Sequence, residues 1–230
     1  TSGGAFLTIQ KALDVTLGTL DLGVYNVTSQ VGSGTYTGNV VMASPQVGAG
    51  RITISGDTTT PANVEISTVG AAISVSGGGS YLCIQGLYLK ATHGNIVDAK
   101  SGGVVEMTGL NRFGDAPQGH RIQAVGGVVI ASAPEEITGT ALGWHYTAEC
   151  NSYINCRSAT WTAISTATQG GFAMAAVGGT VFAYANSSSG TFVGARYLAS
   201  LNGVVMTNGG GASYFPGDSA GGTTTGGQYA

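Results

Sequence analysis

Two acidic residues, Asp115 and Glu136, are the side chains in this 230-residue sequence best suited to cleaving a glycosidic bond. That reaction uses two carboxylates about 5–9.5 Å apart. The two residues stand 21 positions apart, and His120 and Arg121 are close enough in sequence to assist. The simpler interpretation is that these charges are solvated on turns. We therefore expect no catalytic residues, and Asp115, Glu136 and His120 are the candidates if the protein is a glycoside hydrolase or polysaccharide lyase.

A second chemical candidate is Ser219, in the stretch FPGDSAGG at positions 215–222. A similar Gly-Asp-Ser context surrounds the nucleophilic serine of chymotrypsin-like proteases. Such a serine needs a histidine base held by a carboxylate, and an oxyanion hole. None of the three histidines has the sequence context of that base, and Ala220 interrupts the signature. We interpret the stretch as part of a flexible glycine-rich tail.

Aromatic residues offer a binding surface, because aromatic faces stack on sugars and polar rims hydrogen-bond their hydroxyls. The candidate glycan-binding residues are Trp144, Tyr146, Tyr153 and Trp161. The competing interpretation places both tryptophans in the interior or in an interface between chains, and we favour it. Just upstream, Glu135 and Glu136 follow Pro134, and this stretch is interpreted as a loop.

The composition excludes several functions. Charged residues make up 8% of the chain, against about 25% in typical domains, and the net charge is −3. With eight Lys and Arg and no basic cluster, we expect no nucleic-acid binding. No apolar run approaches the roughly 18 residues of a membrane-spanning helix, and the chain opens with no recognisable signal peptide.

The three cysteines, Cys83, Cys150 and Cys156, match no zinc-binding spacing. Buried free thiols are the favoured interpretation, and a disulfide between Cys150 and Cys156 is the alternative. Because dense acid clusters are also missing from the sequence, we expect neither a metal site nor a cofactor.

An internal repeat of about 24 residues decides the architecture. In each unit a small residue, usually glycine, precedes a short apolar run. These corners are Gly79, Gly103, Gly127, Ser152, Gly179 and Gly203. Their spacings are 24, 24, 25, 27 and 24 residues. Such regularity over six units indicates a solenoid of stacked turns.

Runs of alternating apolar and polar residues within each unit, such as AISVS at 72–76, predict short half-buried strands. The sequence therefore predicts an all-β fold, a parallel β-helix with two or three strands per turn. Successive turns would stack about 4.8 Å apart. We expect a right-handed coil, because parallel crossover connections favour that hand.

The chain divides into three expected parts: an N-terminal cap at 1–50, the β-helix turns at 51–207 and a glycine-rich tail at 208–230. The cap is expected to hold a helix that covers the first turn, with Ser2 or Thr8 at its start and Gly18 at its end. Its apolar face consists of Phe6, Ile9, Leu13 and Leu17. The tail has almost nothing to bury, so we expect it to be ordered only by its neighbours.

Both ends of the chain resemble known proteins. Residues 6–14 (FLTIQKALD) and 34–38 (GTYTG) resemble the N-terminal cap of pectin-lyase-like β-helices. Residues 201–230 resemble the C-terminal ends of tailed-bacteriophage tail-fibre and tail-spike proteins. Those ends often read Tyr-Phe-Pro-Gly-(Asn/Asp)-x-Ala-Gly and then Gly-Gly-Gln-Tyr, and this chain has YFPGDSAG and GGQY. Between the two ends, the chain matches only as a generic β-helix.

The resemblance implies a homotrimer of parallel β-helices, located in the virion beside other tail proteins. A low-charge outer face with Tyr, Phe, Ile and Val agrees with burial between chains. We therefore expect a tail-fibre or tail-spike protein that binds bacterial surface polysaccharide during host attachment. Two alternatives stay open: a polysaccharide-degrading tail-spike domain, and a secreted β-helical adhesin unrelated to phage.

Overall fold

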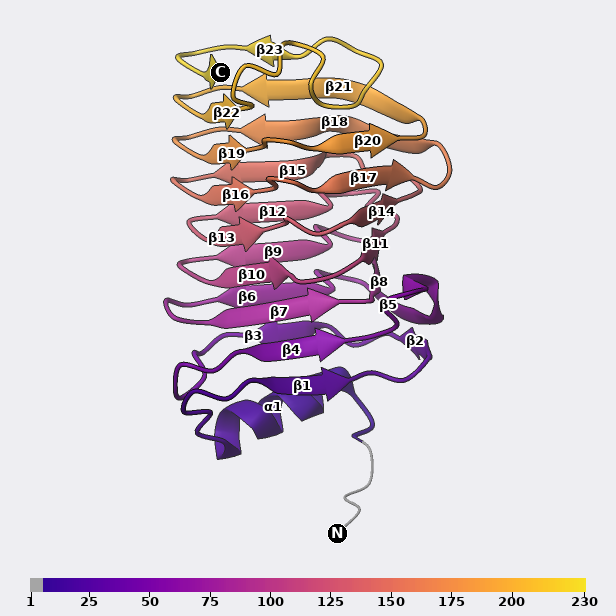
Figure 1. Cartoon of the computed structure of the whole chain (residues 1–230), viewed down its shortest axis with the longest axis vertical. Helices are drawn as coiled ribbons and strands as arrows, with labels where there is room; N and C mark the ends of the chain where they lie inside the picture. The colour runs from indigo at the N-terminus through magenta and orange to yellow at the C-terminus, as the bar shows by residue number, and fades with distance from the viewer. Residues whose placement is uncertain (1–5) are drawn as a thin grey trace.

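The molecule consists mainly of short strands in which buried and more exposed side chains alternate. In β5 (Val64–Thr68), buried and half-exposed side chains alternate at every step, because successive side chains of a strand point to opposite faces. In the computed structural model, which describes residues 6–230, such strands coil into a parallel β-solenoid of about 8 turns with rungs of about 25 residues. The turns stack along the long axis of the molecule (Figure 1). The predicted parallel β-helix is confirmed.

Each turn contributes strands to as many as three parallel sheets, here called sheets I, II and III. Sheet I contains β1 (Val27–Gln30), β4 (Ile52–Ser55), β7 (Tyr81–Gln85), β10 (Val104–Met107), β13 (Val128–Ile130), β16 (Tyr153–Asn155), β19 (Thr180–Phe182), β22 (Val204–Met206) and β24 (Gln228–Tyr229). Sheet II contains β2 (Gly34–Tyr36), β5, β8 (Tyr88–Ala91), β11 (Asn111–Phe113), β14 (Glu135–Ile137), β17 (Thr160–Ala163) and β20 (Ser187–Ser189). Sheet III contains β3 (Val40–Met42), β6 (Ile73–Ser76), β9 (Val97–Lys100), β12 (Ile122–Val125), β15 (Trp144–Glu149), β18 (Ala167–Ala175), β21 (Phe192–Ala199) and β23 (Gly222–Thr223). A short 3-10 helix, η1 (Pro61–Asn63), precedes β5.

The register of sheet I reproduces the repeat of the sequence. Val104 pairs with Val128, and Val128 pairs with Tyr153, 24 and 25 residues later. The first predicted corner shifts by one residue, because Tyr81 pairs with Val104, so Ser80 rather than Gly79 occupies the position of Gly103. The repeat also continues for one more turn than expected, since Val204 pairs with Gln228.

In-register pairing stacks like residues into an apolar interior. One column of sheet I runs through Ile52, Leu82, Val105, Val129, Ile154, Val181 and Val205. All seven side chains are 0% exposed. Complete burial of a Val, Leu or Ile side chain contributes roughly 1.5–3 kcal/mol, so each turn adds its own share to the core.

Glycine recurs at the corners because the backbone of the previous turn passes very close. A Cβ atom on Gly127 would lie 2.5 Å from the carbonyl oxygen of Ala99, which is shorter than real Cβ contacts. The next turn has Ser152 at this corner, and its Oγ donates a hydrogen bond to the carbonyl oxygen of Ala124 at 2.9 Å. The corner thus accepts glycine, or a serine that bonds the neighbouring turn.

A helix caps the N-terminal end, as predicted. Helix α1 (Ile9–Thr19) begins after Thr8, whose Oγ1 accepts a hydrogen bond from the Lys11 amide. It contacts β1 and β3 and lies across the first turn (Figure 1). Leu13 is 1% exposed, whereas Phe6 precedes the helix and is 53% exposed. Ser2 lies outside the described residues.

The C-terminal segment 208–230 belongs to the solenoid, so its prediction as a flexible tail is wrong. Strand β23 pairs with β21, and β24 pairs with β22. Phe215 is 0% exposed and plugs the interior, while Tyr229 stacks on Tyr197 with ring centroids 3.7 Å apart. Pairing also crosses both expected boundaries, since β1 pairs with β4 and β22 with β24. The parts 1–50, 51–207 and 208–230 are therefore continuous.

Candidate functional site

The outward faces of the three sheets differ in chemistry. Sheet II carries charged pairs: Lys90 Nζ lies 2.9 Å from Glu65 Oε2, and Arg112 Nη2 lies 2.6 Å from Glu136 Oε2. The Tyr88 ring lies between these pairs, with Lys90 4.3 Å and Arg112 5.5 Å from its centroid. Arg112 and Glu136 are direct register partners on β11 and β14, whereas Glu65 pairs with Tyr88, so Lys90 reaches Glu65 diagonally from β8 to β5.

The upper part of sheet I is apolar on its outward face. Its half-buried or exposed outward side chains include Val104, Val128, Ile130, Tyr153, Phe182, Val204 and Met206. Lower on the same sheet, Glu106 accepts a hydrogen bond from Tyr81 at 2.7 Å and pairs with Arg51. The apolar outward residues from β10 to β22 are called the apolar face below.

Sheet III carries a polar ladder that crosses several turns. Asn95 Nδ2 donates to Asp98 Oδ1 at 2.8 Å and to Gln123 Oε1 at 2.5 Å. Gln123 Nε2 then donates to Glu149 Oε2 at 2.9 Å, and Lys100 pairs with Asp98 at 2.7 Å. These five residues are called the polar ladder below; Asp98 is buried, at 5% exposure, and the other four are half-buried.

Trp144 is half-buried and begins β15, the strand that ends with Glu149 of the polar ladder. It pairs with Gly171 of the next turn, and a Cβ atom on Gly171 would meet the six-membered part of the Trp144 ring at 2.0 Å. The indole therefore lies directly over the backbone of β18, where only glycine leaves room for it. Its own amide donates to His120 Nδ1 at 2.8 Å.

The predicted catalytic candidates have structural partners. Glu136 pairs with Arg112 on sheet II, and Asp115 Oδ1 accepts a hydrogen bond from the Thr140 amide at 2.8 Å. His120 Nδ1 accepts from the Trp144 amide, and burial lowers the pKa of His120. Within residues 6–230, Asp115 and Glu136 share no hydrogen-bond partner. Ser219 is exposed, and its Oγ donates to Asp218 Oδ1 at 3.2 Å.

The predicted glycan-binding residues separate into three locations. Tyr146 and Trp161 are 0% and 1% exposed, so neither belongs to the surface; for Trp161 this agrees with the favoured interpretation of an interior position. Register is the reason: Tyr146 stands in the column of Ile122 and Ala173, which face the interior. Trp144 lies on sheet III, and Tyr153 lies on the apolar face of sheet I. Only Trp144 is linked to the polar ladder, because its amide donates to His120 and the His120 amide donates to Asn95 Oδ1.

Sequence reasoning missed a polar cluster in the interior. Glu135, assigned to a loop, is the first residue of β14 and is 1% exposed. Its Oε2 lies 2.7 Å from Nε2 of His145, which is 0% exposed, and its Oε1 accepts from the Tyr146 hydroxyl at 2.7 Å. Trp161 Nε1 donates to that hydroxyl at 3.0 Å. The signal was weak, because a strand of three residues does not reveal which of Glu135 and Glu136 points inward.

Arg121 is also buried in the interior, at 0% exposure. Its guanidinium donates to the carbonyl oxygens of Gly114, Thr138 and Gly139 and to Gln169 Oε1. The bonds join two successive connections between sheets II and III to strand β18 of the following turn. Burial lowers the pKa of Arg121 to about 10, so the group stays charged near neutral pH.

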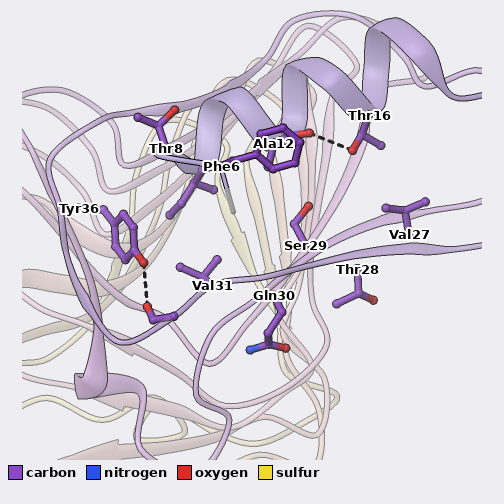
Figure 2. Close-up of a pocket in the computed structure, with 12 residues that line it drawn as sticks. Phe6, Thr8, Ala12, Thr16, Val27, Thr28, Ser29, Gln30, Val31 and Tyr36 are labelled. Atoms are coloured by element: carbon purple, nitrogen blue, oxygen red, sulfur yellow. Dashed lines mark hydrogen bonds between the residues drawn. The ribbon is translucent and has the colours of Figure 1, made fainter. Parts of the chain in front are cut away.

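An uncharged groove of about 490 Å3 opens at the N-terminal end between α1 and β1 (Figure 2). Phe6, Ile9 and Ala12 line its helix side, and Val27 and Val31 line its strand side. Strand β1 pairs with β4 on one side only, so the groove follows an unpaired sheet edge.

The cysteines are unpaired throughout the described chain. Cys83 and Cys156 are buried, as favoured, whereas Cys150 is exposed at a turn and forms no disulfide with Cys156. Among residues 6–230, no three His, Cys, Asp or Glu side chains gather as a metal site would require. Nor does this part of the chain contain a helix long and apolar enough to cross a bilayer.

Fold and surface define the chain as an all-β parallel β-solenoid with one α-helix, at its N-terminal end, among the described residues. Comparison with known proteins adds no closer relationship. The chain matches no family of known proteins, no curated protein and no solved structure.

Proposed function

We propose that this chain is part of a tailed-bacteriophage tail fibre or tail spike that binds bacterial surface polysaccharide during host attachment. The β-solenoid fold and the resemblance of residues 201–230 to the ends of such proteins support this proposal. In this function the protein belongs to the virion and contacts other tail proteins.

The observation that carries the glycan-binding part is the position of the half-buried Trp144 on β15, the strand that also holds Glu149 of the polar ladder. An indole face stacks on the apolar face of a sugar ring, and carboxylate and carboxamide groups bond its hydroxyls. The ladder spans β9 to β15, so its groups follow an extended chain of sugars better than a single monosaccharide. On sheet II the Tyr88 ring already contacts Lys90 and Arg112, and the charged groups beside it are paired with one another.

The proposed homotrimer rests on the apolar face of sheet I. The other two outward faces carry charged pairs or the polar ladder. Removing water from the apolar face therefore costs the least free energy of the three. Tyr153, Ile130 and Phe182 would then contact neighbouring chains, and the polar ladder would stay open to solvent.

Two measurements test the proposal separately. Light scattering on the full chain should give a mass near three chains, and Val128→Glu on the apolar face should reduce it. Binding to purified bacterial surface polysaccharides should fall at least about fivefold in Trp144→Ala, since a ring stacked on an aromatic side chain contributes about 1–3 kcal/mol. Tyr25→Ala, which removes an exposed aromatic just before β1, several turns away from Trp144, is the matched control.

The outcomes also distinguish the alternatives. Release of soluble sugar fragments from the polysaccharide would favour a degrading tail-spike domain over a binding protein. A mass of one chain would remove the trimer and favour a solitary β-helical adhesin. Loss of binding in Tyr25→Ala as in Trp144→Ala would contradict a site on sheet III.

A further inference from the structure

The hydrogen bonds around Glu135 on β14 and His145 on β15 limit how many protons these two buried side chains can hold. Trp161 Nε1 donates to the Tyr146 hydroxyl, so that hydroxyl directs its own proton to Glu135 Oε1. Oε1 is therefore an acceptor. The remaining oxygen, Oε2, faces His145 Nε2 at 2.7 Å, and a single proton lies between the two atoms.

Three proton arrangements fit these contacts. A carboxylic acid can donate to a neutral imidazole, or an imidazolium can donate to a carboxylate. Both arrangements leave the pair without net charge and contain the same number of protons. In the third, a neutral imidazole donates to a carboxylate, and the pair carries a full negative charge in the interior.

The surroundings disfavour the negatively charged arrangement. Aromatic rings enclose the pair: His145 lies 5.8 Å from Phe113 and 4.9 Å from Phe172, measured between ring centroids. No Lys or Arg among residues 6–230 pairs with Glu135. A buried charge without an ionic partner costs several kcal/mol, and such groups usually take up a proton instead.

The other ionisable groups near the pair each have a definite protonation state. Burial raises the pKa values of Tyr146 and Cys156 well above their usual ranges, so both stay neutral. Arg121, on the preceding turn, is positive and disfavours a second proton on His145, but its bonds go to carbonyl oxygens and Gln169. His145 Nδ1 has no hydrogen-bond partner within the described chain.

We infer that Glu135 and His145 form a pair without net charge inside the solenoid, with the proton on Glu135, and that the fold is most stable in mildly acidic solution and weakens in alkaline solution. The pair is a pH-sensitive element in the middle of the column, between the turns of β11 and β17. This inference stands independently of the proposed glycan binding.

The pH range follows from the two groups together. Burial raises the pKa of Glu135 from an ordinary 4.5 to about 8, so its contribution is complete below pH 4.5 and is lost as the pH rises to about 8. Burial, and then the charge of Arg121, lowers the pKa of His145 well below 6.5, so its contribution is complete above pH 6.5. Below pH 6.5 the two dependences therefore oppose each other. Above pH 6.5 only Glu135 contributes a pH dependence, and it lowers the free energy of unfolding as the pH rises.

Urea unfolding of the full chain from pH 6.5 to 8 tests the inference, with Glu135→Gln as the main variant. The amide keeps a donor for Nε2 and an acceptor for Tyr146 but does not titrate. In the wild type, the unfolding equilibrium constant should rise by up to about tenfold per pH unit, and the variant should lose this rise. Glu136→Gln, which changes the neighbouring outward glutamate, should keep it.

Infrared spectroscopy on the folded wild type gives a second measurement that needs no variant. Glutamate labelled with carbon-13 should show the carbonyl band of a protonated carboxylic acid near neutral pH, and the band should disappear as the pH rises past about 8. Absence of this band at neutral pH would overturn the inference. An unchanged pH dependence in Glu135→Gln would do the same.

Discussion

Phe215 lies against Trp161, with their ring centroids 5.8 Å apart and their planes 30° apart. The two residues are 54 positions apart in the chain, and both side chains are fully buried. A residue from the glycine-rich C-terminal segment therefore closes the apolar interior above the turn that holds Trp161. This contact gives a segment with few apolar residues a fixed place on the solenoid.

Replacing Phe215 with alanine should lower the free energy of unfolding by about 3–5 kcal/mol, because it opens the interior beside Trp161 and Phe172. Urea unfolding followed by circular dichroism measures the change. Tyr25→Ala, at a position 78% exposed, should change it by less than about 0.5 kcal/mol. Equal effects in the two variants would show that Phe215 does not seal the interior.

Alanine at the Gly127 corner should destabilise the protein by at least about 1–3 kcal/mol, since the added Cβ atom would press on the backbone of Ala99. The matched control is Gly38→Ala, where nothing lies within 4 Å of the new atom. That change should be neutral or stabilise by up to about 1 kcal/mol. Thermal unfolding of both variants measures these changes. A lower thermal stability in Gly38→Ala together with an unchanged stability in Gly127→Ala would contradict the close stacking of successive turns.

Cysteine reactivity should separate the three thiols. Cys150 is exposed, whereas Cys83 and Cys156 are buried, and burial raises the pKa of Cys83 to about 11. A thiol-alkylating reagent at pH 8 should therefore add one label to the folded protein and three to the protein in urea. Mass spectrometry counts the labels, and Cys150→Ser should lose the one added to the folded state. Rapid labelling of Cys156 in the folded protein would mean that the interior opens near β16.

Substituting Arg121 with methionine should lower the free energy of unfolding by at least about 2 kcal/mol, because several buried carbonyl oxygens and Gln169 lose their hydrogen-bond donor. Amide hydrogen exchange should quicken at the turn of Thr138 and Gly139. The control, Arg157→Met, changes an exposed arginine and should leave both quantities unchanged. Normal exchange at this turn in Arg121→Met would show that the guanidinium does not hold it.

The repeat was the part of the fold that the sequence could predict. Corner residues and apolar runs recur together, and parallel pairing turns that recurrence into register, as between Val104 and Val128. The assignment of residues to the inward or outward side could not be predicted as well. Tyr146 and Trp161 are suited to either side, and only pairing with neighbouring turns places them inside.

The interior polar cluster was harder still to predict. Glu135 and Glu136 are adjacent and chemically alike, yet alternation on β14 buries the first and pairs the second with Arg112. The C-terminal segment was misjudged for a different reason. Its composition is poor in apolar residues, but one phenylalanine and two short strands are enough when a preformed column offers them a place.

In-register stacking has a consequence for the evolution of length. Because each corner repeats the geometry of the one before, duplicating the stretch from Gly103 to Gly126 would insert a whole turn between β9 and β13 without changing the contacts at either end. Each such duplication would lengthen the column by about 4.8 Å and leave its cross-section unchanged. Gene duplication can therefore adjust the reach of this protein in small, equal steps.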